Sequence, residues 1–522
     1  MRSSGARGAA GVANACGVTS ARGLACLALV LAGCAVPGPP PRAAGGERLP
    51  AAATAETGSR PVAEREAERE AEREARSDGS APPGSAVFLS VWNAAARQRE
   101  LRLIDSETGQ PVPGSPPVSL ELGAGPAFLG ASAVSPDGAT LAAGAPAGQS
   151  CEPFAGGVSC RGGAGTLHVV EPRSGRHAAV ALPARGWLGP LAFSPDAARL
   201  ALALNDERAS TLLVVDPSTE RIVAERVLEP GLRPSLLAYG RGGATLVAYA
   251  APLGADPGVS RPGPPRVLLL DAASLETLWD HTLGSVLSGH WCLESCAASH
   301  EQRLSASWTP AVVLSHDRRA VHIVHADEER LTTVDLDSRS VRSAEVRVAQ
   351  SWLERLLGLT AGVAHAKGGI EGASKAAVLS PDGARLHVLG RTTRSQRGAG
   401  GAWSIDVAVG LQVIEVESGR RLAARDREGW GIRLAPDGTH VLVDGWTDQQ
   451  RWVELVDASS LEPVARLMGW DVSAARRLDG RPVLLASRST RESTELAVLA
   501  AGSLDVLHAW SVPGQASWIA TP

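Results

Sequence analysis

The chain has 522 residues and a formal net charge of −4 at pH 7, from 51 Lys and Arg against 55 Asp and Glu. Domains that bind nucleic acid carry a basic patch or stripe, and this sequence has none, so we expect no nucleic-acid partner. A chain of this length usually forms several domains. Here, repeats that cover most of the chain predict one repetitive domain instead.

The N-terminus has the features of a bacterial export signal. Arg2, Arg7 and Arg22 supply positive charge, and Leu24 to Leu31 forms an apolar stretch. This stretch is too short to span a membrane. It ends in Leu31-Ala32-Gly33-Cys34, which resembles the lipobox of bacterial lipoproteins, whose cysteine thiol receives diacylglycerol.

The lipobox resemblance implies that residues 1–33 are a lipoprotein signal peptide and that the mature chain begins at a lipidated Cys34. The expected location is the extracytoplasmic side of the bacterial cell envelope, with the lipid holding the chain on the membrane. Ala35 is not an aspartate-type retention signal, so in a diderm host the resemblance implies sorting to the outer membrane. The alternative is a short buried helix with an unrelated cysteine.

Residues 34–85 are predicted to be a disordered tether. They are rich in Pro, Ala and Gly and are too poor in apolar residues to bury a core. Residues 63–76 repeat Ala-Glu-Arg-Glu, which places Arg and Glu at i,i+3 and predicts a solvated helix. We expect this segment to act as a spacer between the membrane and the folded domain.

From Ala86 onward, one turn motif recurs between pairs of apolar runs. In its first copy, Ser135-Pro136-Asp137-Gly138, proline presets φ, aspartate accepts local backbone hydrogen bonds and glycine supplies positive φ. A second hairpin follows each copy, as in Leu167 to Val180, so each unit predicts a four-stranded sheet. The later copies begin at Ser194, Gly240, Ser315, Ser380, Ala435 and Arg477.

One hairpin, which turns at Asp105 to Gly109, has no such motif before it. It is preceded only by the strand Ala86 to Trp92. The last residues, Ala516 to Pro522, read like the apolar run that precedes the motif elsewhere. We therefore expect the C-terminal strand to complete the N-terminal sheet and close a ring. Seven repeats and one split sheet predict eight blades, or seven if one weak repeat forms no sheet.

These repeats resemble bacterial β-propellers of the YVTN and PD40 (TolB-like, WD40-like) type. The resemblance rests on motifs such as Ala133-Val134-Ser135-Pro136-Asp137-Gly138 and Val214-Val215-Asp216-Pro217-Ser218-Thr219, and it covers residues 86–522. It implies an all-β propeller of four-stranded blades. It implies no particular activity, because propellers carry many unrelated functions.

Four cysteines lie within the repeats as two local pairs. Cys151 and Cys160 fall in a Gly-rich insertion, and Cys292 and Cys296 fall in a long connection. Local pairs in an extracytoplasmic protein predict two disulfides that staple loops. The alternative is a metal site formed by His290, Cys292, Cys296 and His300, whose residue types suit zinc but whose spacing matches no known finger.

A set of bulky residues occupies similar positions shortly before the turn motif. Equivalent positions in a propeller lie on one rim, near the mouth of the central channel. The set predicts either a surface that stacks on a ligand or partner, or packing between blades. Its members are Phe128, Trp187, Arg233, Trp308, Trp430 and Trp470.

The connection from Ser351 to Ser374 contains a second apolar group. Trp352, Leu353 and Leu356 belong to an amphipathic turn or two, followed by a Gly-rich stretch. The pattern predicts either a helix that projects for a partner or a segment packed on its own propeller.

Two classes of function remain. The sequence has no Gly-x-Ser-x-Gly, His-Glu-x-x-His or phosphate-binding Gly-Lys motif. This favours a non-catalytic binding or assembly platform, monomeric and without a cofactor, with an envelope protein or glycan as partner. The alternative is an envelope enzyme of lactonase-like or quinoprotein-like propeller type.

Overall fold

The computed structural model describes the repeat region with short gaps, and the findings below concern these residues alone. They are 86–93, 98–120, 131–146, 150–154, 157–161, 164–185, 187–206, 209–252, 262–292, 304–348, 369–398, 401–447, 450–478, 480–490 and 492–519. Cys34, the tether at 34–85 and its predicted helix at 63–76 lie outside them. Phe128, Cys296 and His300 lie outside them as well.

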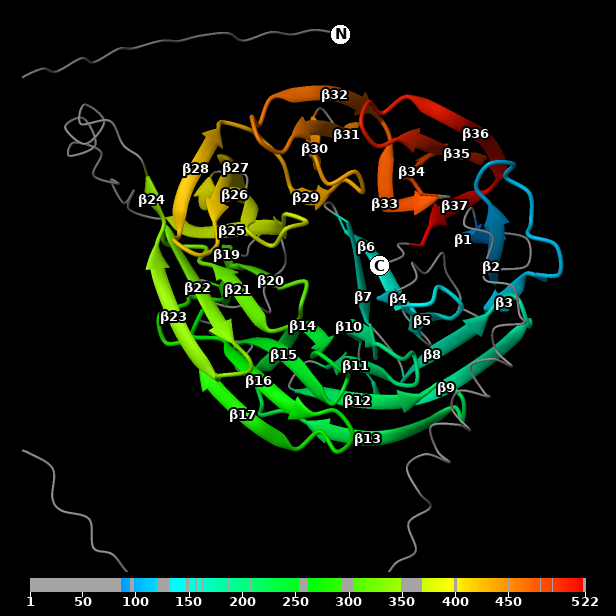
Figure 1. Cartoon of the computed structure of the whole chain (residues 1–522), viewed down its shortest axis with the longest axis horizontal. Coiled ribbons are helices and arrows are strands. Elements are labelled where there is room, and N and C mark those ends of the chain that lie inside the picture. Colours follow the sequence, from blue (N-terminus) through cyan, green and yellow to red (C-terminus); the bar gives the residue numbers. More distant parts are fainter. Residues whose placement is uncertain are drawn as a thin grey trace, which may run out of the picture. The chain divides into compact units, whose positions relative to one another are not determined.

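The described residues form an all-β propeller of eight blades, as the repeats predicted (Figure 1). Each blade is an antiparallel sheet whose first strand lies nearest the propeller axis and whose fourth lies outermost. The described part of the chain contains no helix, and so none that is long and apolar enough to cross a membrane.

The strands of each blade follow the chain from the axis outward, except in blade 1, where the innermost strand comes from the far end of the chain. Blade 1 consists of β37 (Gln515–Trp518), β1 (Ala86–Asn93), β2 (Gln98–Asp105) and β3 (Val118–Leu120). Blade 2 consists of β4 (Ser132–Val134), β5 (Leu141–Pro146), β8 (Ala164–Glu171) and β9 (Arg176–Arg185). Blade 3 consists of β10 (Trp187–Phe193), β11 (Leu200–Asn205), β12 (Ser210–Asp216) and β13 (Arg221–Val227), and blade 4 consists of β14 (Leu232–Tyr239), β15 (Thr245–Pro252), β16 (Arg266–Asp271) and β17 (Thr277–Thr282).

The other four blades continue the ring in chain order. Blade 5 consists of β20 (Ala311–Leu314), β21 (Ala320–Val324), β22 (Arg330–Asp335) and β23 (Ser340–Glu345). Blade 6 consists of β25 (Gly369–Leu379), β26 (Arg385–Gly398), β27 (Gly401–Glu415) and β28 (Arg420–Arg425). Blade 7 consists of β29 (Gly431–Leu434), β30 (His440–Thr447), β31 (Gln450–Asp457) and β32 (Pro463–Met468), and blade 8 consists of β33 (Asp471–Leu478), β34 (Arg481–Ser489), β35 (Ser493–Ala500) and β36 (Val506–Pro513).

Five further strands lie in the connections between these elements. β6 (Ser150–Phe154) and β7 (Gly157–Arg161) form a separate hairpin, and β18 (Gly289–Cys292), β19 (Ser305–Thr309) and β24 (Arg347–Val348) extend the sheet of blade 6 to seven strands. The end of the connection predicted to be amphipathic, residues 369–374, is thus the beginning of β25, while 349–368 lie outside the described residues.

The C-terminal strand closes the ring, in agreement with the sequence-based expectation. β37 pairs antiparallel with β1, so that Trp518 lies opposite Leu89 and Ala516 opposite Val91. The Trp518 indole N–H donates to the carbonyl of Ala486 in blade 8 (2.8 Å) and thereby ties the closing strand to the preceding blade. The first and last elements of the domain therefore share one sheet, which removes a free edge at the closure.

The core consists of apolar layers between neighbouring blades. Leu167 and Val169 of blade 2 pack with Leu200 and Leu202 of blade 3 in one such cluster of buried residues. Each blade buries both faces because it has a neighbour on each side. This arrangement explains why the second and third strands are continuous apolar runs rather than alternating ones.

The four motif turns that begin at Ser135, Ser194, Ser315 and Ser380 repeat one set of hydrogen bonds. In the copy at Ser194, the backbone N–H of Ala197 donates to the carbonyl of Ser194 (2.9 Å). The Ser194 hydroxyl donates to the carboxylate of Asp196 (2.6 Å), which also accepts the N–H of Ala198 (3.1 Å). The fourth turn residue needs positive φ, which is +70° at Gly138 but +59° at both Ala197 and Arg318.

The turns between third and fourth strands also place one residue in the left-handed region. Gly175 and Gly419 fill this position in blades 2 and 6, with φ of +67° and +70°, whereas Leu461 fills it in blade 7 with φ of +60°. Leu461 is fully buried, at 0% exposure, in the cluster between blades 6 and 7. A side chain that packs well thus outweighs the cost of the left-handed backbone, which is about 1–2 kcal/mol.

Two substitutions to glycine should therefore act in opposite directions. Ala197→Gly relieves left-handed strain at a position that buries little, so we expect the free energy of unfolding to rise by about 0.5–1 kcal/mol. Leu461→Gly relieves similar strain but removes a buried side chain, so we expect a fall of about 2–4 kcal/mol. Urea denaturation followed by circular dichroism measures both. A stabilising Leu461→Gly would contradict this explanation.

Candidate functional site

The two faces of the propeller differ in their connections. Because each blade is a four-stranded antiparallel meander, the turns from first to second and from third to fourth strand lie on one face, which we call the turn face. The connections from second to third strand and between blades lie on the other, which we call the loop face. The turn face carries the short repeated turns, and loops that vary in length and structure are the usual carriers of function.

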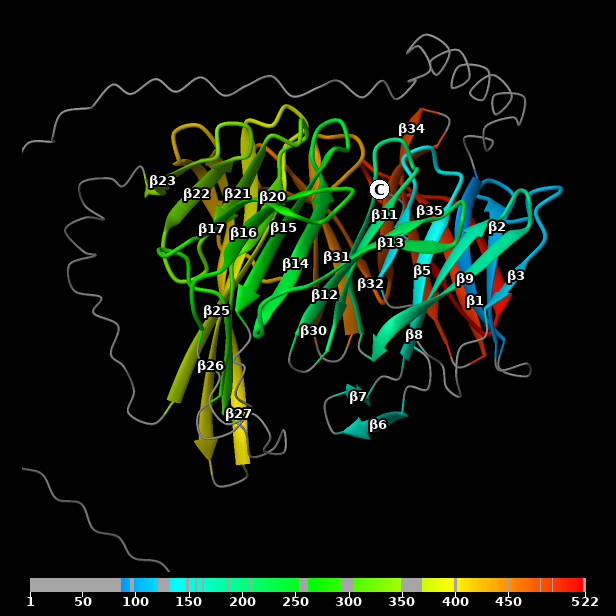
Figure 2. The same cartoon turned by 90° about the horizontal axis from the view of Figure 1, so that it is seen from below.

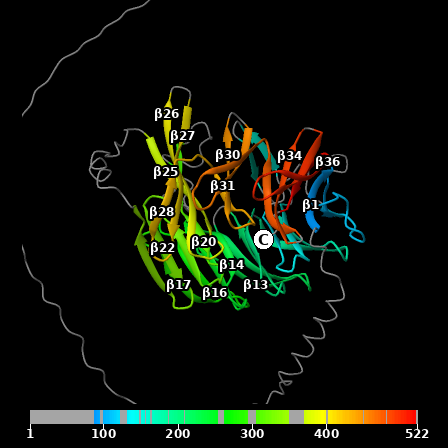
Figure 3. The same cartoon turned by 45° about the horizontal axis from the view of Figure 1, so that its top comes forward.

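Two structures project from the loop face (Figure 2). One is the hairpin of β6 and β7. The other, which we call the arm, consists of residues 369–374 of β25, 391–398 of β26 and 401–409 of β27, and it extends beyond the other blades (Figure 3). A register shift between Gly390 and Arg391 marks the base of the arm. Gly410, with φ of +101°, lies opposite this shift, and a Cβ there would meet the carbonyl of Arg425.

The face of the arm that points toward blade 7 is polar. The Arg391 Nε–H donates to the hydroxyl of Ser374 (2.8 Å), and Arg391 Nη1 lies 3.8 Å from the carboxylate of Asp406. That carboxylate also accepts the hydroxyl of Thr393 (2.5 Å). Burial lowers the pKa of Arg391, and Asp406 opposes this shift. The guanidinium is thus held in one orientation by the side chains of Ser374 and Asp406, and Thr393 in turn orients Asp406.

Arg391 lies over the ring of Trp430, which precedes the first strand of blade 7. The guanidinium carbon is 3.8 Å from the ring centroid, a cation–π contact. The backbone N–H of Trp430 donates to the carbonyl of Asp444 (2.7 Å). The side chain of Trp430 is nonetheless 52% exposed. The loop face therefore presents a large aromatic side chain whose position is fixed but whose surface remains accessible.

An ion-pair network continues from Trp430 toward blade 8. The carboxylate of Asp444 lies 3.4 Å from Arg433 and 3.7 Å from Arg451, and Arg451 pairs with Asp471 at 2.7 Å. Asp471 begins the first strand of blade 8, directly after Trp470. Half-buried networks of this kind fix geometry more than they add stability. The network links blades 7 and 8 along the rim that carries Trp430.

The described rim residues lie at or near the starts of innermost strands, with one exception. Trp187 begins β10, Arg233 is near the start of β14, and Trp430 and Trp470 immediately precede β29 and β33. Trp308 instead lies in β19, which pairs with β18 and β25 and so belongs to the sheet of blade 6. β19 extends the sheet of blade 6 at the arm, and the chain enters the sheet of blade 5 only at β20.

The rim residues differ in exposure. Trp470 is buried, at 8% exposure, and packs between blades 7 and 8, with the Arg488 guanidinium carbon 4.8 Å from its ring centroid. Arg233 donates to the carbonyl of Asp206 (3.1 Å), and burial lowers its pKa to about 10. Trp470 is therefore packed between blades, whereas the ring of Trp430 is half exposed, and ligand binding by the rim stays a prediction.

Sequence reasoning missed two residues beside this rim. Arg391 lies in a long strand with no turn motif near it, and its contact with Trp430 joins two blades. Trp446, at the end of β30, is 58% exposed on the same face. The sequence offers one signal for Trp446: it stands among polar residues, in Asp444-Gly445-Trp446-Thr447, rather than within an apolar run.

The base of the arm carries a second cation on its opposite face. Lys375 is buried, and its ammonium donates to the carbonyl of Glu328 (2.9 Å) in the loop between β21 and β22. Burial lowers the pKa of Lys375, while Glu329 and Asp327 raise it. His325 in the same loop is fully buried and hydrogen-bonds through Nε2 to the hydroxyl of Thr332 (2.7 Å). These contacts hold the loop of blade 5 against blade 6.

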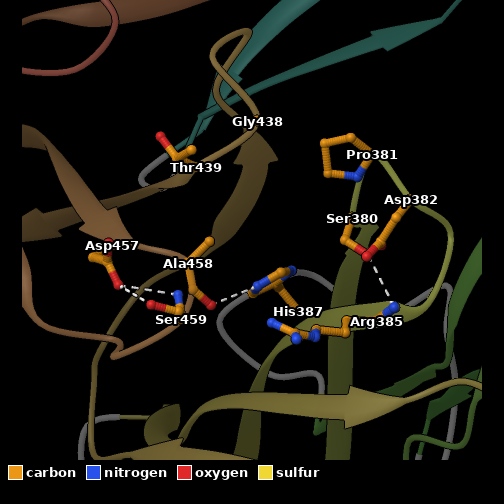
Figure 4. Close-up of a pocket in the computed structure, with 10 residues that line it drawn as sticks. All are labelled: Ser380, Pro381, Asp382, Arg385, His387, Gly438, Thr439, Asp457, Ala458 and Ser459. Carbon is orange, nitrogen blue, oxygen red and sulfur yellow. Dashed lines mark hydrogen bonds between the residues drawn. The ribbon is translucent and has the colours of Figure 1, made fainter.

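The turn face carries pockets between neighbouring blades. One, of about 430 Å³, lies between blades 6 and 7 (Figure 4). On its walls, the carboxylate of Asp382 accepts the hydroxyl of Ser380 (2.5 Å), and His387 Nε2 donates to the carbonyl of Ala458 (2.8 Å). These polar groups are engaged in the repeated turns. A second pocket, of about 240 Å³, lies beside Ala86, where blade 1 has no turn between its first and second strands.

The predicted cysteine pairs are only partly described. β6 and β7 place Cys151 directly opposite Cys160, as a cross-strand disulfide requires, and the disulfide itself stays a prediction. Cys292 ends β18, and His290 near it hydrogen-bonds to the hydroxyl of Ser307 (2.9 Å). Among the described residues, no group of three or more His, Cys, Asp or Glu could hold a metal ion.

No protein-family model and no curated protein matches the sequence. Solved structures do resemble it. Dihydro-heme d1 dehydrogenase NirN in complex with DHE shares 15% identity, over 84% of this chain and 76% of that chain, with a TM-score of 0.48. The periplasmic gluconolactonase PpgL of Pseudomonas aeruginosa shares 15% identity, over 84% and 100%, with a TM-score of 0.37. The Myceliophteria thermophila Swd1 β-propeller domain shares 12%, over 74% and 97%, with a TM-score of 0.38. Likenesses at these identities concern the fold alone.

Buried histidines should make the propeller sensitive to acid. Burial is the main cause that lowers the pKa of His168, His322 and His325 to about 4. In the unfolded chain each binds a proton near pH 6.5. As the pH falls from about 6.5 toward 4, the unfolded state therefore binds more protons, and the free energy of unfolding decreases.

The slope of the free energy of unfolding against pH measures this effect. We expect His322→Gln to reduce that slope between pH 6.5 and 4 by up to one proton, or about 1.4 kcal/mol per pH unit. His508→Gln, at an exposed position of β36, is the control. An unchanged slope in His322→Gln would show that His322 is not buried as a neutral side chain.

Proposed function

We propose that this protein is a lipid-anchored, extracytoplasmic lipoprotein whose propeller, with repeats of the YVTN and PD40 type, serves as a non-catalytic binding platform in the bacterial cell envelope. Three features of the sequence support the anchor: the export signal, the lipobox that ends at Cys34, and the tether of residues 34–85. A tether of that composition keeps a folded domain near a membrane while leaving it free to meet partners.

The observation that carries the binding proposal is the half-exposed Trp430, held under Arg391 on the loop face. An exposed aromatic side chain usually finds many positions in solution. This one is fixed by the cation–π contact and by the turn to β29, so a partner that stacks on it loses little additional conformational freedom. The chemistry suits a sugar ring of an envelope glycan or an apolar side chain of an envelope protein.

The anchor is tested by labelling the full-length chain with an alkyne analogue of palmitate in a bacterial host. We expect wild type to carry the label and to sediment with membranes, because the Cys34 thiol receives the lipid. Cys34→Ser should lose the label and leave the membrane fraction. Cys26→Ser, which changes another cysteine of the predicted signal peptide, is the control. Label retained in Cys34→Ser would overturn the anchor.

The platform is tested by photo-crosslinking of the anchored chain in its native envelope. Trp430→Ala removes the exposed ring and should reduce capture of its partner, glycan or protein, at least tenfold. Leu507→Ala is the matched control, because Leu507 is 47% exposed but lies on the outermost strand of blade 8. Equal capture by both variants would show that the partner binds elsewhere. Thermal denaturation checks that each variant remains folded.

A further inference from the structure

The pocket between blades 6 and 7 on the turn face gathers charged groups that lack partners. Its volume is about 430 Å³, within the range of roughly 300–1,000 Å³ that is usual for sites of small-molecule ligands. Arg385 and Asp457 both line it (Figure 4). Each occupies a position that recurs from blade to blade, so the same position in another blade shows which partner each one lacks.

Blade 3 has the complete arrangement. Arg199 directly precedes its second strand, Asp216 ends its third strand, and the two side chains form an ion pair at 2.6 Å. The turn after Asp216 uses the other carboxylate oxygen, which accepts the backbone N–H of Ser218 (2.9 Å). The guanidinium of Arg199 thus pairs with the oxygen that the turn leaves unused.

Blade 6 keeps the cation of this pair without its acid. Arg385 stands where blade 3 has Arg199, and Glu415 lies opposite it on the third strand. Glu415 pairs instead with Arg420, across its own turn, at 3.7 Å. Within the described residues, no hydrogen bond or ion pair engages the guanidinium of Arg385. The side chain is exposed and extends from blade 6 toward blade 7 (Figure 4).

Blade 7 keeps the acid of this pair without its cation. Asp457 ends β31, and the residue opposite it is His440. His440 binds Asp437 of the motif turn instead, through Nδ1 at 2.6 Å. The turn after Asp457 engages one carboxylate oxygen, which accepts the backbone N–H of Ser460 (2.7 Å). In the part of the chain that the structure describes, every hydrogen bond to this carboxylate goes to that same oxygen.

A second carboxylate, Asp382, lines the pocket across from Asp457 (Figure 4). The motif turn engages one of its oxygens, through the hydroxyl of Ser380 (2.5 Å) and the backbone N–H of Ala384 (3.0 Å). These hydrogen bonds lower the pKa of Asp382, and those from Ser460 and its neighbour lower the pKa of Asp457. Both carboxylates are therefore ionised at neutral pH, and the pocket carries two negative charges and one positive charge.

Contacts between the two blades hold the walls of the pocket in place. His387 is buried and donates through Nε2 to the carbonyl of Ala458 (2.8 Å). Burial lowers the pKa of His387, so this side chain is neutral and adds no charge. The two motif turns also meet, since a Cβ at Gly438 would lie 2.8 Å from the Cγ of Pro381. A ligand that enters this preformed site loses little binding free energy to ordering of the protein.

We propose that this pocket binds a basic amino acid, a ligand with one carboxylate and two cationic groups. The ligand carboxylate pairs with the guanidinium of Arg385, and the two cations pair with the unused oxygens of Asp457 and Asp382. Each charged group of the pocket then gains a partner of opposite sign, in charge-assisted hydrogen bonds. The proposal rests on neither the lipid anchor nor Trp430, which lies on the other face of the propeller.

Titration calorimetry of the detergent-solubilised full-length chain tests the class of ligand. Lysine is compared with analogues that each lack one charge: cadaverine lacks the carboxylate, norleucine the side-chain ammonium and ε-aminocaproate the α-ammonium. We expect lysine to bind saturably and each analogue to bind about tenfold more weakly or worse, because it leaves a charge of the pocket unpaired. The proposal is overturned if neither lysine nor arginine binds, or if any analogue binds as tightly as lysine.

Two substitutions test where the ligand binds. Arg385→Gln should weaken lysine by about tenfold or more without weakening cadaverine, because it removes only the partner of the carboxylate. Asp457→Asn should weaken both, while its amide oxygen can still accept the hydrogen bonds of the turn. Arg199→Gln and Asp216→Asn are the matched controls, because they change the same positions in blade 3 and should leave lysine binding unaltered.

Lysine binding that survives Arg385→Gln would place the ligand elsewhere and overturn the proposal. Thermal denaturation checks that each variant remains folded. If Asp457→Asn does not fold, the comparison of lysine with cadaverine in the wild type and in Arg385→Gln still decides. Photo-crosslinking at Trp430 is a separate measurement on the other face, so either proposal can fail while the other stands.

Discussion

The pairing of β37 with β1 is the constraint on which the rest of the propeller depends. It brings residues from the two ends of the repeat region into one sheet, and contacts from blade 8 reinforce it: the indole of Trp518 reaches the carbonyl of Ala486, and Arg476 donates to the carbonyl of Ala86 (2.8 Å). Once the ring is closed, no blade can tilt without disturbing its neighbours. The contacts between Arg391 and Trp430, and between Arg451 and Asp471, each join two neighbouring blades of the closed ring.

The repeat explains why function is expected on the loop face. The turns of the other face need left-handed residues and internal hydrogen bonds. Gly fills the left-handed position in several of these turns, whereas Ala197 and the buried Leu461 fill it in others. Side chains in such turns are largely engaged by the turn itself, as Ser380 and one oxygen of Asp382 are. The loop face has no such requirement, so its connections are free to lengthen into the arm and the β6–β7 hairpin.

The fold was predictable from the sequence because its signals are local. Each turn motif lies next to the strands it connects, and Trp518 stands in an apolar run that lacks its own turn. These signals predicted the closure and eight blades, with seven as the alternative. The site was predictable only in part. The position of Trp430 follows from the repeat, but the arm does not, because residues 391–404 are rich in Arg, Ser, Thr and Gly and contain no apolar run that would predict a strand. Packing between blades determines two further features: the contact of Arg391 with Trp430, and the position of Trp308 in the sheet of blade 6. Such packing cannot be predicted from a local sequence pattern.

The two faces of the arm carry different side chains because successive side chains of a strand point to opposite faces. Ser374, Arg391, Thr393 and Asp406 point toward blade 7 and hold the cation that orients Trp430. Ile405, Val407 and Val409 alternate with them and point the other way. A slip of one residue between β26 and β27 would exchange these faces, placing valines against Trp430 and Asp406 on the outer side. The register shift after Gly390 and the positive φ of Gly410 fix the register at the base of the arm, so these two glycine positions determine which face of the arm meets blade 7.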